Sequence, residues 1–166
     1  VTIPFYVNDE IGYLANSFNR MSAELDGMIA DLESRVAART SALRESEMQY
    51  RQIFDLESDA IFIIRNADGQ ILEANNAAVE LYGYTRDELV MRRNTDLSAE
   101  PEATHKATHS PIPTDQIVKI PLRWHRKKDG TLFPISITAR FITWKNESVH
   151  LAAIRDITEQ HRFEQE

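Results

Sequence analysis

Long segments without proline or glycine set the first constraint on this chain. No proline occurs between Pro4 and Pro101, and no glycine occurs between Gly27 and Gly69. Because these two residue types most often end or interrupt helices, the sequence predicts one long helix over residues 9–50, with room for a single joint. At about 1.5 Å per residue such a helix is roughly 60 Å long, which is longer than a compact small domain accommodates.

Apolar side chains follow this helix at coiled-coil spacing. From Leu14 the successive intervals are four, three, four, three and four residues, which is a heptad pattern. A second interval of four, from Leu32 to Val36, forms a stutter that locally unwinds a left-handed coiled coil. We therefore predict a homodimer held by a parallel coiled coil. Its seam would comprise Leu14, Phe18, Met21, Leu25, Met28, Leu32, Val36 and Leu43.

A single amphipathic helix packed on its own domain is the alternative arrangement. It would leave several turns overhanging the domain with leucine and methionine side chains in water, and exposed apolar patches of that kind are unusual in a monomer. The surfaces between the apolar positions mix charges of both signs, as at Asp31, Glu33, Arg35 and Arg39. They are typical of a solvated helix face with some intrahelical ion pairs.

Composition excludes several functional classes. The 19 basic and 26 acidic residues give a net charge of −7, which argues against nucleic-acid binding, because that needs a clustered basic surface. Cysteine is absent, so disulfides, cysteine-ligated metals, cysteine nucleophiles and a flavin photosensor based on a cysteinyl adduct are excluded. No apolar run approaches the roughly 20 residues that span a bilayer. The chain starts at Val1 without a signal peptide, so we expect a piece of a longer protein.

From residue 51 the pattern becomes that of a sheet with short helices. Residues 61–64 form a continuous apolar run, typical of a strand buried on both faces. A turn at 66–69 and a second strand at 71–74 follow. Asn75 and Asn76 are suitable N-caps for a helix over 77–84 that Gly83 can end. The segment from Thr85 to Glu88 resembles a capping box, and residues 92–116 indicate short helices and loops.

Three further strands are expected near the C-terminus, at 117–126, 131–143 and 149–156. The result is an α+β fold with a five-stranded antiparallel sheet and flanking short helices, preceded by the long helix. Pro121 and Pro134 suggest edge positions or bulges. Strict alternation would put Ile120, Leu122 and Trp124 on the inner face and His125 on the outer one.

Five segments together resemble a PAS sensor domain. They are YRQIFDLESDAIFII, NADGQILEANNAA, ELYGYTRDEL, RKKDGTLFPISI and AAIRDITEQ, which occur in this order between residues 50 and 162. We assign 50–158 to this domain. The resemblance implies that Asp156, Ile157 and Thr158 form the motif that passes into an output helix, whose start we assign to 159–166.

The N-terminal third resembles other signalling modules. Residues 9–21, DEIGYLANSFNRM, resemble the second helix of a HAMP domain, with Val1 and Ile3 in its connector. We assign 1–27 to this partial HAMP domain, whose first helix is missing, and 28–49 to a signalling coiled-coil helix. This arrangement is similar to that of bacterial membrane sensor histidine kinases, diguanylate cyclases and chemoreceptors. It implies the cytoplasmic portion of an inner-membrane protein, anchored upstream.

The PAS resemblance also implies a ligand pocket between the sheet and the short helices. Plain core packing of the same side chains is an equally open interpretation, and few polar groups are expected in the lining, so no arginine clamp for an anionic dicarboxylate is evident. His150 shares its strand phase with Ala152, so we place it inward, as a core histidine. The candidate lining residues are Ile63, Val79, Tyr82, Leu89, Ile120, Leu122, Trp124, Ile135, Ile137, Ala152 and Ile154.

Cofactor and catalytic sites are weakly indicated. His105 and His109 share a helix face, but two histidines are too few for a structural zinc site, so no metal is expected. By resemblance, His105 is the candidate axial ligand if the domain binds haem. The glycines stand alone and no nucleophile motif occurs, so no catalytic residue is assigned. We expect this chain to be a non-catalytic relay without a cofactor, taken from a histidine kinase or a diguanylate cyclase. The alternative is a gas or redox sensor that binds haem or flavin.

Overall fold

The computed structural model describes residues 10–110 and 112–163. The predicted HAMP connector residues Val1 and Ile3, and the last three residues of the predicted output helix, lie outside this range. The chain divides into two compact units, Val1–Tyr50 and Arg51–Glu166.

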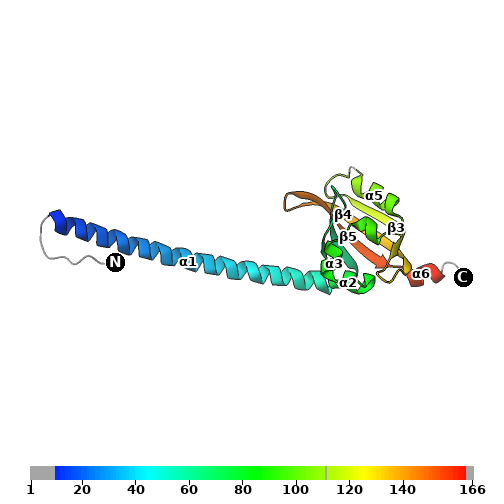
Figure 1. The fold of residues 1–166 in the computed structure, drawn as a ribbon, viewed down its shortest axis with the longest axis horizontal. Helices are drawn as coiled ribbons and strands as arrows, with labels where there is room; N and C mark the ends of the chain where they lie inside the picture. The colour runs from blue at the N-terminus through cyan, green and yellow to red at the C-terminus, as the bar shows by residue number, and fades with distance from the viewer. Residues whose placement is uncertain (1–9, 111, 164–166) are drawn as a thin grey trace. The chain divides into compact units, whose positions relative to one another are not determined.

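Helix α1, Glu10–Leu56, is a single continuous element of 47 residues (Figure 1). The prediction of one long helix is confirmed. The helix passes the stutter at Leu32 and Val36 without a break, and it ends six residues later than the sequence pattern indicated. All eight predicted seam residues are exposed in the single chain, from Phe18 at 39% to Leu14 and Leu43 at 69%.

The second unit is built on a five-stranded sheet, as predicted. Every neighbouring pair is antiparallel, and the strand order is β2-β1-β5-β4-β3. The first and last strands of the sequence are thus central neighbours, and β3 is an edge strand. The strands are β1 Ala60–Arg65, β2 Ile71–Ala74, β3 Ile117–Arg126, β4 Leu132–Trp144 and β5 Glu147–Asp156.

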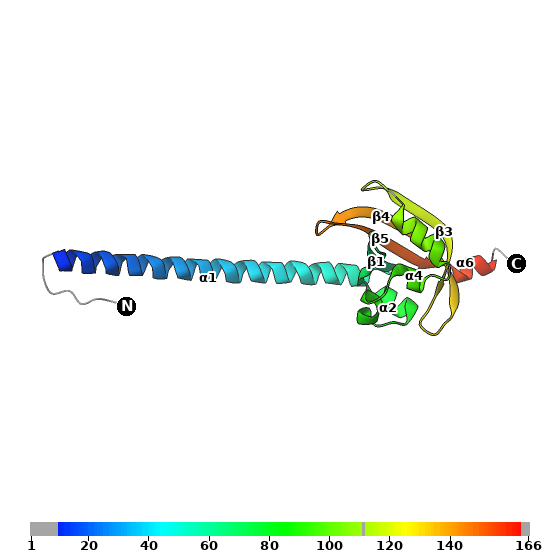
Figure 2. The ribbon, with the colours of Figure 1, turned by 45° about the horizontal axis from the view of Figure 1, so that its top comes forward.

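Short helices fill the connection between β2 and β3. Helix α2 contacts β1, and α3 contacts β2. Helix α5 lies next to β3, the edge strand opposite β2 (Figure 1, Figure 2). These helices are α2 Asn76–Tyr82, α3 Arg86–Val90, α4 Asn94–Leu97 and α5 Pro101–His109, and α6 Thr158–Phe163 follows the last strand.

Local capping chemistry sets these helices as the sequence predicted. Asn75 is the N-cap of α2, and its Oδ1 accepts from the Ala78 amide at 3.0 Å. Gly83 ends α2 with φ of 75°, a left-handed conformation that glycine adopts without strain. Thr85 and Glu88 form a reciprocal capping box at the start of α3.

Asn75 also joins three elements. Its side chain is fully buried. Besides capping α2, its Oδ1 accepts from the Ile61 amide at 2.9 Å, and its Nδ2 donates to the carbonyls of Phe54 and Asp59 at 3.2 and 3.0 Å. One amide thereby fixes the end of α1, the start of β1 and the start of α2. Each of its groups has a partner, as burial of a polar side chain requires.

A bulge in β3 changes the phase of that strand. Ile120 pairs with Ile137, but the next aligned pair is Arg123 with Ile135, so β3 has one extra residue there. Pro121 lies in this interval, where its missing N–H costs no ladder hydrogen bond. After the bulge, Arg123 and His125 replace Leu122 and Trp124 on the helix-covered face of the sheet. His125 is buried, whereas Leu122 and Trp124 are exposed, so the expectation of strict alternation is wrong here.

The core lies between the sheet and the short helices. Phe62, Ile64 and Ile154 from the sheet pack there with Tyr82 and Leu89 from α2 and α3. The Tyr82 ring meets the rings of Phe62 and Phe133 edge to face, with centroids 5.5 Å apart in both cases. Such aromatic pairs add to the stabilisation from apolar burial. This cluster fills the space between α2, α3 and the helix-covered face of the sheet.

Candidate functional site

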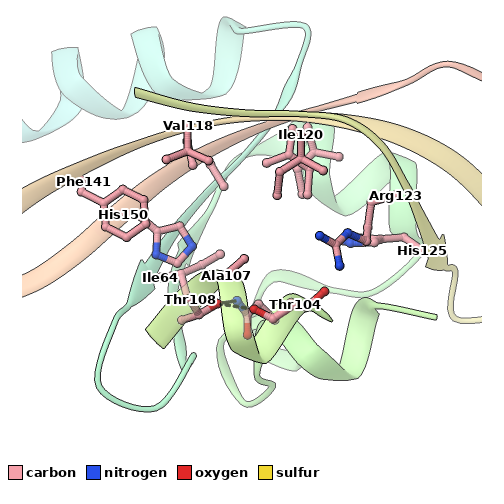
Figure 3. Close-up of a pocket in the computed structure, with 15 residues that line it drawn as sticks. Ile64, Thr104, Ala107, Thr108, Val118, Ile120, Arg123, His125, Phe141 and His150 are labelled. Atoms are coloured by element: carbon pink, nitrogen blue, oxygen red, sulfur yellow. Dashed lines mark hydrogen bonds between the residues drawn. The ribbon is translucent and has the colours of Figure 1, made fainter. Parts of the chain in front are cut away.

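A cavity of about 60 Å³ lies between helix α5 and strands β3, β4 and β5 (Figure 3). Its walls are largely apolar, with Val118 and Phe141 from the sheet and Ala107 from α5. Ile64, Ala152 and Ile154 line the cavity and also belong to the core. The cavity and the core therefore share one face of the sheet.

Four of the eleven residues proposed from the sequence line this cavity. They are Ile120 on β3, Ile137 on β4, and Ala152 and Ile154 on β5. All four share one face of the sheet, because Ile137 pairs with both Ile120 and Ile154, and Ala152 lies two residues before Ile154 on β5. Here the regular alternation of the strands is sufficient to assign the face.

The other seven lie elsewhere. Ile63 is buried but out of phase with Phe62 and Ile64, and therefore lies on the other face of the sheet. A continuous apolar run such as 61–64 carries no alternation from which to choose the face. Leu122 and Trp124 are turned outward by the bulge. The remaining four pack in or against the core rather than on the cavity: Val79, Tyr82, Leu89 and Ile135.

Several lining residues were missed by sequence reasoning. Asn94, Thr104 and Thr108 bring polar atoms to the helix side of the cavity. The spacing of Thr104, Ala107 and Thr108 puts these small residues on one face of α5, which is the signal that could have identified them. Missed on the sheet side are Ile64, Val118, Arg123, Ala139 and Phe141.

The bulge brings Arg123 and His125 to the same end of the cavity (Figure 3). The two residues are two positions apart on β3, so their side chains project to the same side. Nη1 of Arg123 and Nε2 of His125 are both buried and have no hydrogen-bond partner among the described residues. No ion pair found within the described ranges includes Arg123. Because His125 is buried and lines the cavity, the prediction that it lies on the outer face of the sheet is wrong.

The proton of His125 can be assigned from its neighbour. The Tyr82 hydroxyl lies 2.7 Å from Nδ1 of His125. Burial raises the pKa of Tyr82 well above its ordinary value, with a further contribution from Asp156. Burial, assisted by the charge of Arg123, lowers the pKa of His125 to about 3. Both groups are neutral at pH 7. Because the Tyr82 hydroxyl has no other acceptor among the described residues, the phenol donates to Nδ1, which places the imidazole proton on Nε2.

His150 lines the opposite end of the cavity, where Phe141 stacks on its ring. Its Nδ1 lies 2.6 Å from Oδ1 of Asn66, whose Nδ2 donates to the Ser148 hydroxyl at 2.8 Å. The amide orientation makes Asn66 Oδ1 the acceptor, so His150 carries its proton on Nδ1. Burial lowers the pKa of His150 to about 4. This histidine is neutral at pH 7.

His105 lies outside the cavity. Its side chain is exposed on α5, and its ring stacks on that of His109 with centroids 4.0 Å apart. The cavity is also several times smaller than the roughly 300 Å³ at the lower end of pockets for drug-sized ligands. Neither the candidate ligand nor the available space fits haem, and the space does not fit a flavin.

The Asp-Ile-Thr segment joins β5 to α6. Oδ1 of Asp156 accepts from both the amide and the hydroxyl of Thr158, which caps the first turn of α6. The Ile157 amide donates to the Pro134 carbonyl at 3.1 Å. On the neighbouring strand, the outward Trp124 ring contacts His161 of α6 edge to face, with centroids 5.8 Å apart. Strand β3 therefore contacts the cavity on one face and α6 on the other.

Within residues 10–110 and 112–163, no cluster of three or more histidine, aspartate or glutamate side chains is placed to hold a metal ion. No helix in the same ranges is both long and apolar enough to cross a membrane.

Curated relatives of this chain include two signalling proteins. The methyl sulfide methyltransferase-associated sensor of Methanosarcina acetivorans is 30% identical over 149 residues, which is 89% of this chain and 14% of that protein. Diguanylate cyclase DgcM of Escherichia coli O157:H7 is 25% identical over 142 residues, which is 82% of this chain and 34% of that protein. The chain thus spans only a minor part of each relative.

Solved structures with the same fold are also PAS domains. The PAS domain of an HTR-like protein from Haloarcula marismortui superposes with a TM-score of 0.66 at 22% identity, covering 72% of this chain and 98% of that one. The PAS domain of nitrogen regulation protein NR(II) from Vibrio parahaemolyticus gives a TM-score of 0.54 at 21% identity, covering 64% and 96%. The PAS domain family model matches residues 58–159 of this sequence. The chain therefore belongs to the PAS domain family.

Proposed function

We propose that this chain is the dimeric sensory and relay segment of a longer signalling protein. The PAS fold assigns the sensory role, and the domain is non-catalytic. The observation that carries the dimer is the row of eight apolar side chains at heptad spacing along α1, all exposed in the single chain. A second copy in parallel register would cover them by knobs-into-holes packing.

The two ends of the domain suit a relay. Helix α1 runs without interruption into the domain, so a shift or rotation of a coiled coil would reach Phe54 and Asp55, which touch Asn75 and Asn76. At the other end, Asp156 caps α6, and Trp124 contacts that helix. Coupling requires two states that the input biases differently. The stutter between Leu32 and Val36 is where we place two coiled-coil packings of similar free energy.

The parent protein belongs to the same proposal. The resemblance of residues 9–21 to a HAMP helix supports an anchored receptor upstream, with this chain on the cytoplasmic side of an inner membrane. The sensor and cyclase relatives support a histidine kinase or a diguanylate cyclase as the output. In this scheme the small cavity receives a chemical signal inside the cell and α6 carries the response onward.

The dimer is tested with matched double substitutions in α1. Leu25→Glu with Leu32→Glu puts charges into the seam. Ala23→Glu with Ala30→Glu puts the same charges on the opposite side of the helix, because each position lies two residues before a seam leucine, about 200° away around the helix axis. Sedimentation velocity should show a dimer for the unchanged chain and for the control pair, and a monomer for the seam pair.

Two outcomes would overturn the coiled-coil proposal. One is a monomeric unchanged chain at tens of micromolar concentration. The other is a dimer that survives the seam substitutions, which would assign dimerisation to surfaces of the PAS domain. Native mass spectrometry of the same samples reports any retained small molecule, so ligand binding is judged separately from oligomeric state.

A further inference from the structure

The polar groups at the β3 end of the cavity indicate the class of ligand more directly than its apolar walls do. The two threonine hydroxyls of α5 already donate, Thr104 to Ser98 Oγ at 2.8 Å and Thr108 to the Thr104 carbonyl at 2.9 Å. Arg123 and His125 differ from them, because each has a buried nitrogen without any partner among the described residues. The cavity thus presents two free donors at one end.

Unpartnered buried donors cost free energy, and a buried charge costs more. His125 is 3% exposed, so water has little access to its Nε2. Arg123 keeps its positive charge at any physiological pH, and its charge already contributes to the lowered pKa of His125. An anion at this position would satisfy both donors and neutralise the guanidinium. A neutral ligand would leave the charge uncompensated.

The bulge in β3 places Arg123 and His125 on the cavity side of the strand. Without the extra residue in β3, regular alternation would turn Leu122 and Trp124 inward, and this end of the cavity would lose both of its basic side chains. The strand accommodates Pro121 at the bulge and pairs again with β4 from Arg123 to Arg126. The fold thereby accepts a local irregularity and two unsatisfied donors, a combination found at functional sites.

Size and shape narrow the ligand class. A volume of about 60 Å³ corresponds to roughly four to six water-sized positions at about 10–15 Å³ each. A carboxylate offers two oxygens to two neighbouring donors, as in arginine–carboxylate pairs. Most of the remaining lining, including Ile137, Ala152 and Ile154, is apolar and suits a short alkyl chain; its polar members are Asn94, Thr104, Thr108 and His150. A phosphate would place charged oxygens against those apolar walls.

We infer that this cavity binds a small monocarboxylate of about two to four carbons, whose carboxylate accepts hydrogen bonds from Arg123 and His125 and whose alkyl chain lies against β4 and β5. This inference rests on the proposed sensory role, since it names the class of signal that the domain would detect. The sequence alone made no arginine clamp for an anionic ligand evident, because Arg123 was not identified as a lining residue.

Titration calorimetry on the whole chain tests the inference with three probes of similar shape. Propionate carries the charge, whereas propionamide and 1-propanol are neutral. Propionate should bind at least tenfold more tightly than either neutral probe, and sodium chloride at the same ionic strength should not compete. Equal binding of propionate and propionamide would overturn the anionic class while leaving a small-molecule sensor. Competition by chloride alone, or no binding of any probe, would overturn the carboxylate site.

Variants of β3 assign the binding to the named side chains. Arg123→Met keeps most of the side-chain volume and should weaken propionate binding at least tenfold. Arg126→Met removes the same charge from an exposed position on the same strand and should leave affinity unchanged. Arg123→Lys retains the positive charge and should bind propionate more tightly than Arg123→Met. It also serves as the test variant if the methionine disturbs folding. Unchanged affinity in a folded Arg123→Met would contradict the assignment. Sedimentation of each sample keeps a ligand result separate from the dimer.

Discussion

The Tyr82 hydroxyl lies 2.7 Å from Nδ1 of His125, although 43 positions separate the two residues in the sequence. Tyr82 ends α2 and is fully buried in the core, whereas His125 lies on the edge strand and lines the cavity. This hydrogen bond connects the two ends of the helix-covered face. It also fixes the imidazole tautomer that presents an N–H to the cavity.

Replacing Tyr82 by phenylalanine tests this connection. The substitution preserves the ring contacts with Phe62 and Phe133 but leaves Nδ1 of His125 buried without a donor, so we expect a loss of about 1–3 kcal/mol in the free energy of unfolding. Urea denaturation followed by circular dichroism measures it. Tyr84→Phe, at a partly exposed ring, is the control and should stay within about 0.5 kcal/mol. Equal stabilities for the two variants would contradict the assigned bond.

Stability should fall as the pH is lowered from 7.5 to 5. His125 and His150 have folded-state pKa values of about 3 and about 4, below the roughly 6.5 of an unfolded histidine. The unfolded chain therefore binds protons more readily in this window, and folding stability decreases as pH falls below 6.5 toward those lower values. At pH 5 the free energy of unfolding should be lower by roughly 2 kcal/mol per histidine. Urea unfolding at each pH measures this change.

Variants identify the groups responsible for that pH dependence. His150→Gln should remove about half of the loss, because an amide can still pair with Asn66 but does not titrate. His105→Gln removes an exposed imidazole on α5 and is the matched control. A pH profile unaffected by His150→Gln but flattened by His105→Gln would contradict the buried-histidine explanation.

Gly69 should tolerate alanine poorly. Its φ is +74°, and a Cβ there would lie 2.5 Å from Oδ1 of Asn94, whose Nδ2 donates to Thr108. Backbone strain and displacement of this buried amide together should cost about 2–4 kcal/mol. Gly130 has φ of +90° but open space around it. Gly130→Ala should therefore lower the free energy of unfolding by only about 1–2 kcal/mol. Equal losses in thermal or urea unfolding would mean that Asn94 moves aside freely.

Removing the stutter should alter signalling in the full protein. Deletion of residues 33–36 leaves an interval of seven positions from Leu32 to Leu43, so the heptad becomes continuous. We expect the coiled coil to favour one packing and the output to become locked in one state. Deletion of a complete heptad, 33–39, shortens the helix but retains a four-residue interval between Leu32 and Leu43, and serves as the comparison. Unchanged output after removal of 33–36 would contradict a switching role for the stutter.

The fold could be predicted from the sequence because its local signals agree. The long segment without proline or glycine predicted α1, Asn75 and Gly83 bounded α2, and Thr85 with Glu88 started α3. The predicted bounds of β3 match those of the structure, and those of β4 agree within a residue at each end. In each case a short-range physical rule is sufficient: capping, turn chemistry or period-two alternation.

The candidate site could be predicted only in part, because its composition depends on pairing between strands. Pro121 indicated an edge position or a bulge, but the direction of every later side chain in β3 depends on where β4 accommodates the extra residue. His125 was therefore assigned to the wrong face, and Arg123 was not identified as a lining residue. Ile63 was chosen over Ile64 because an unbroken apolar run has no phase of its own. Both errors concern side-chain direction, not the presence of the element.

The extra residue in β3 has an evolutionary consequence. A shortening of this strand by one codon would exchange a basic lining for an aromatic and aliphatic one while the core of Phe62, Tyr82 and Leu89 stayed in place. Domains with this sheet can therefore diverge in chemical preference through a single insertion or deletion at an edge, a route that leaves most of the sequence and the stability of the scaffold intact.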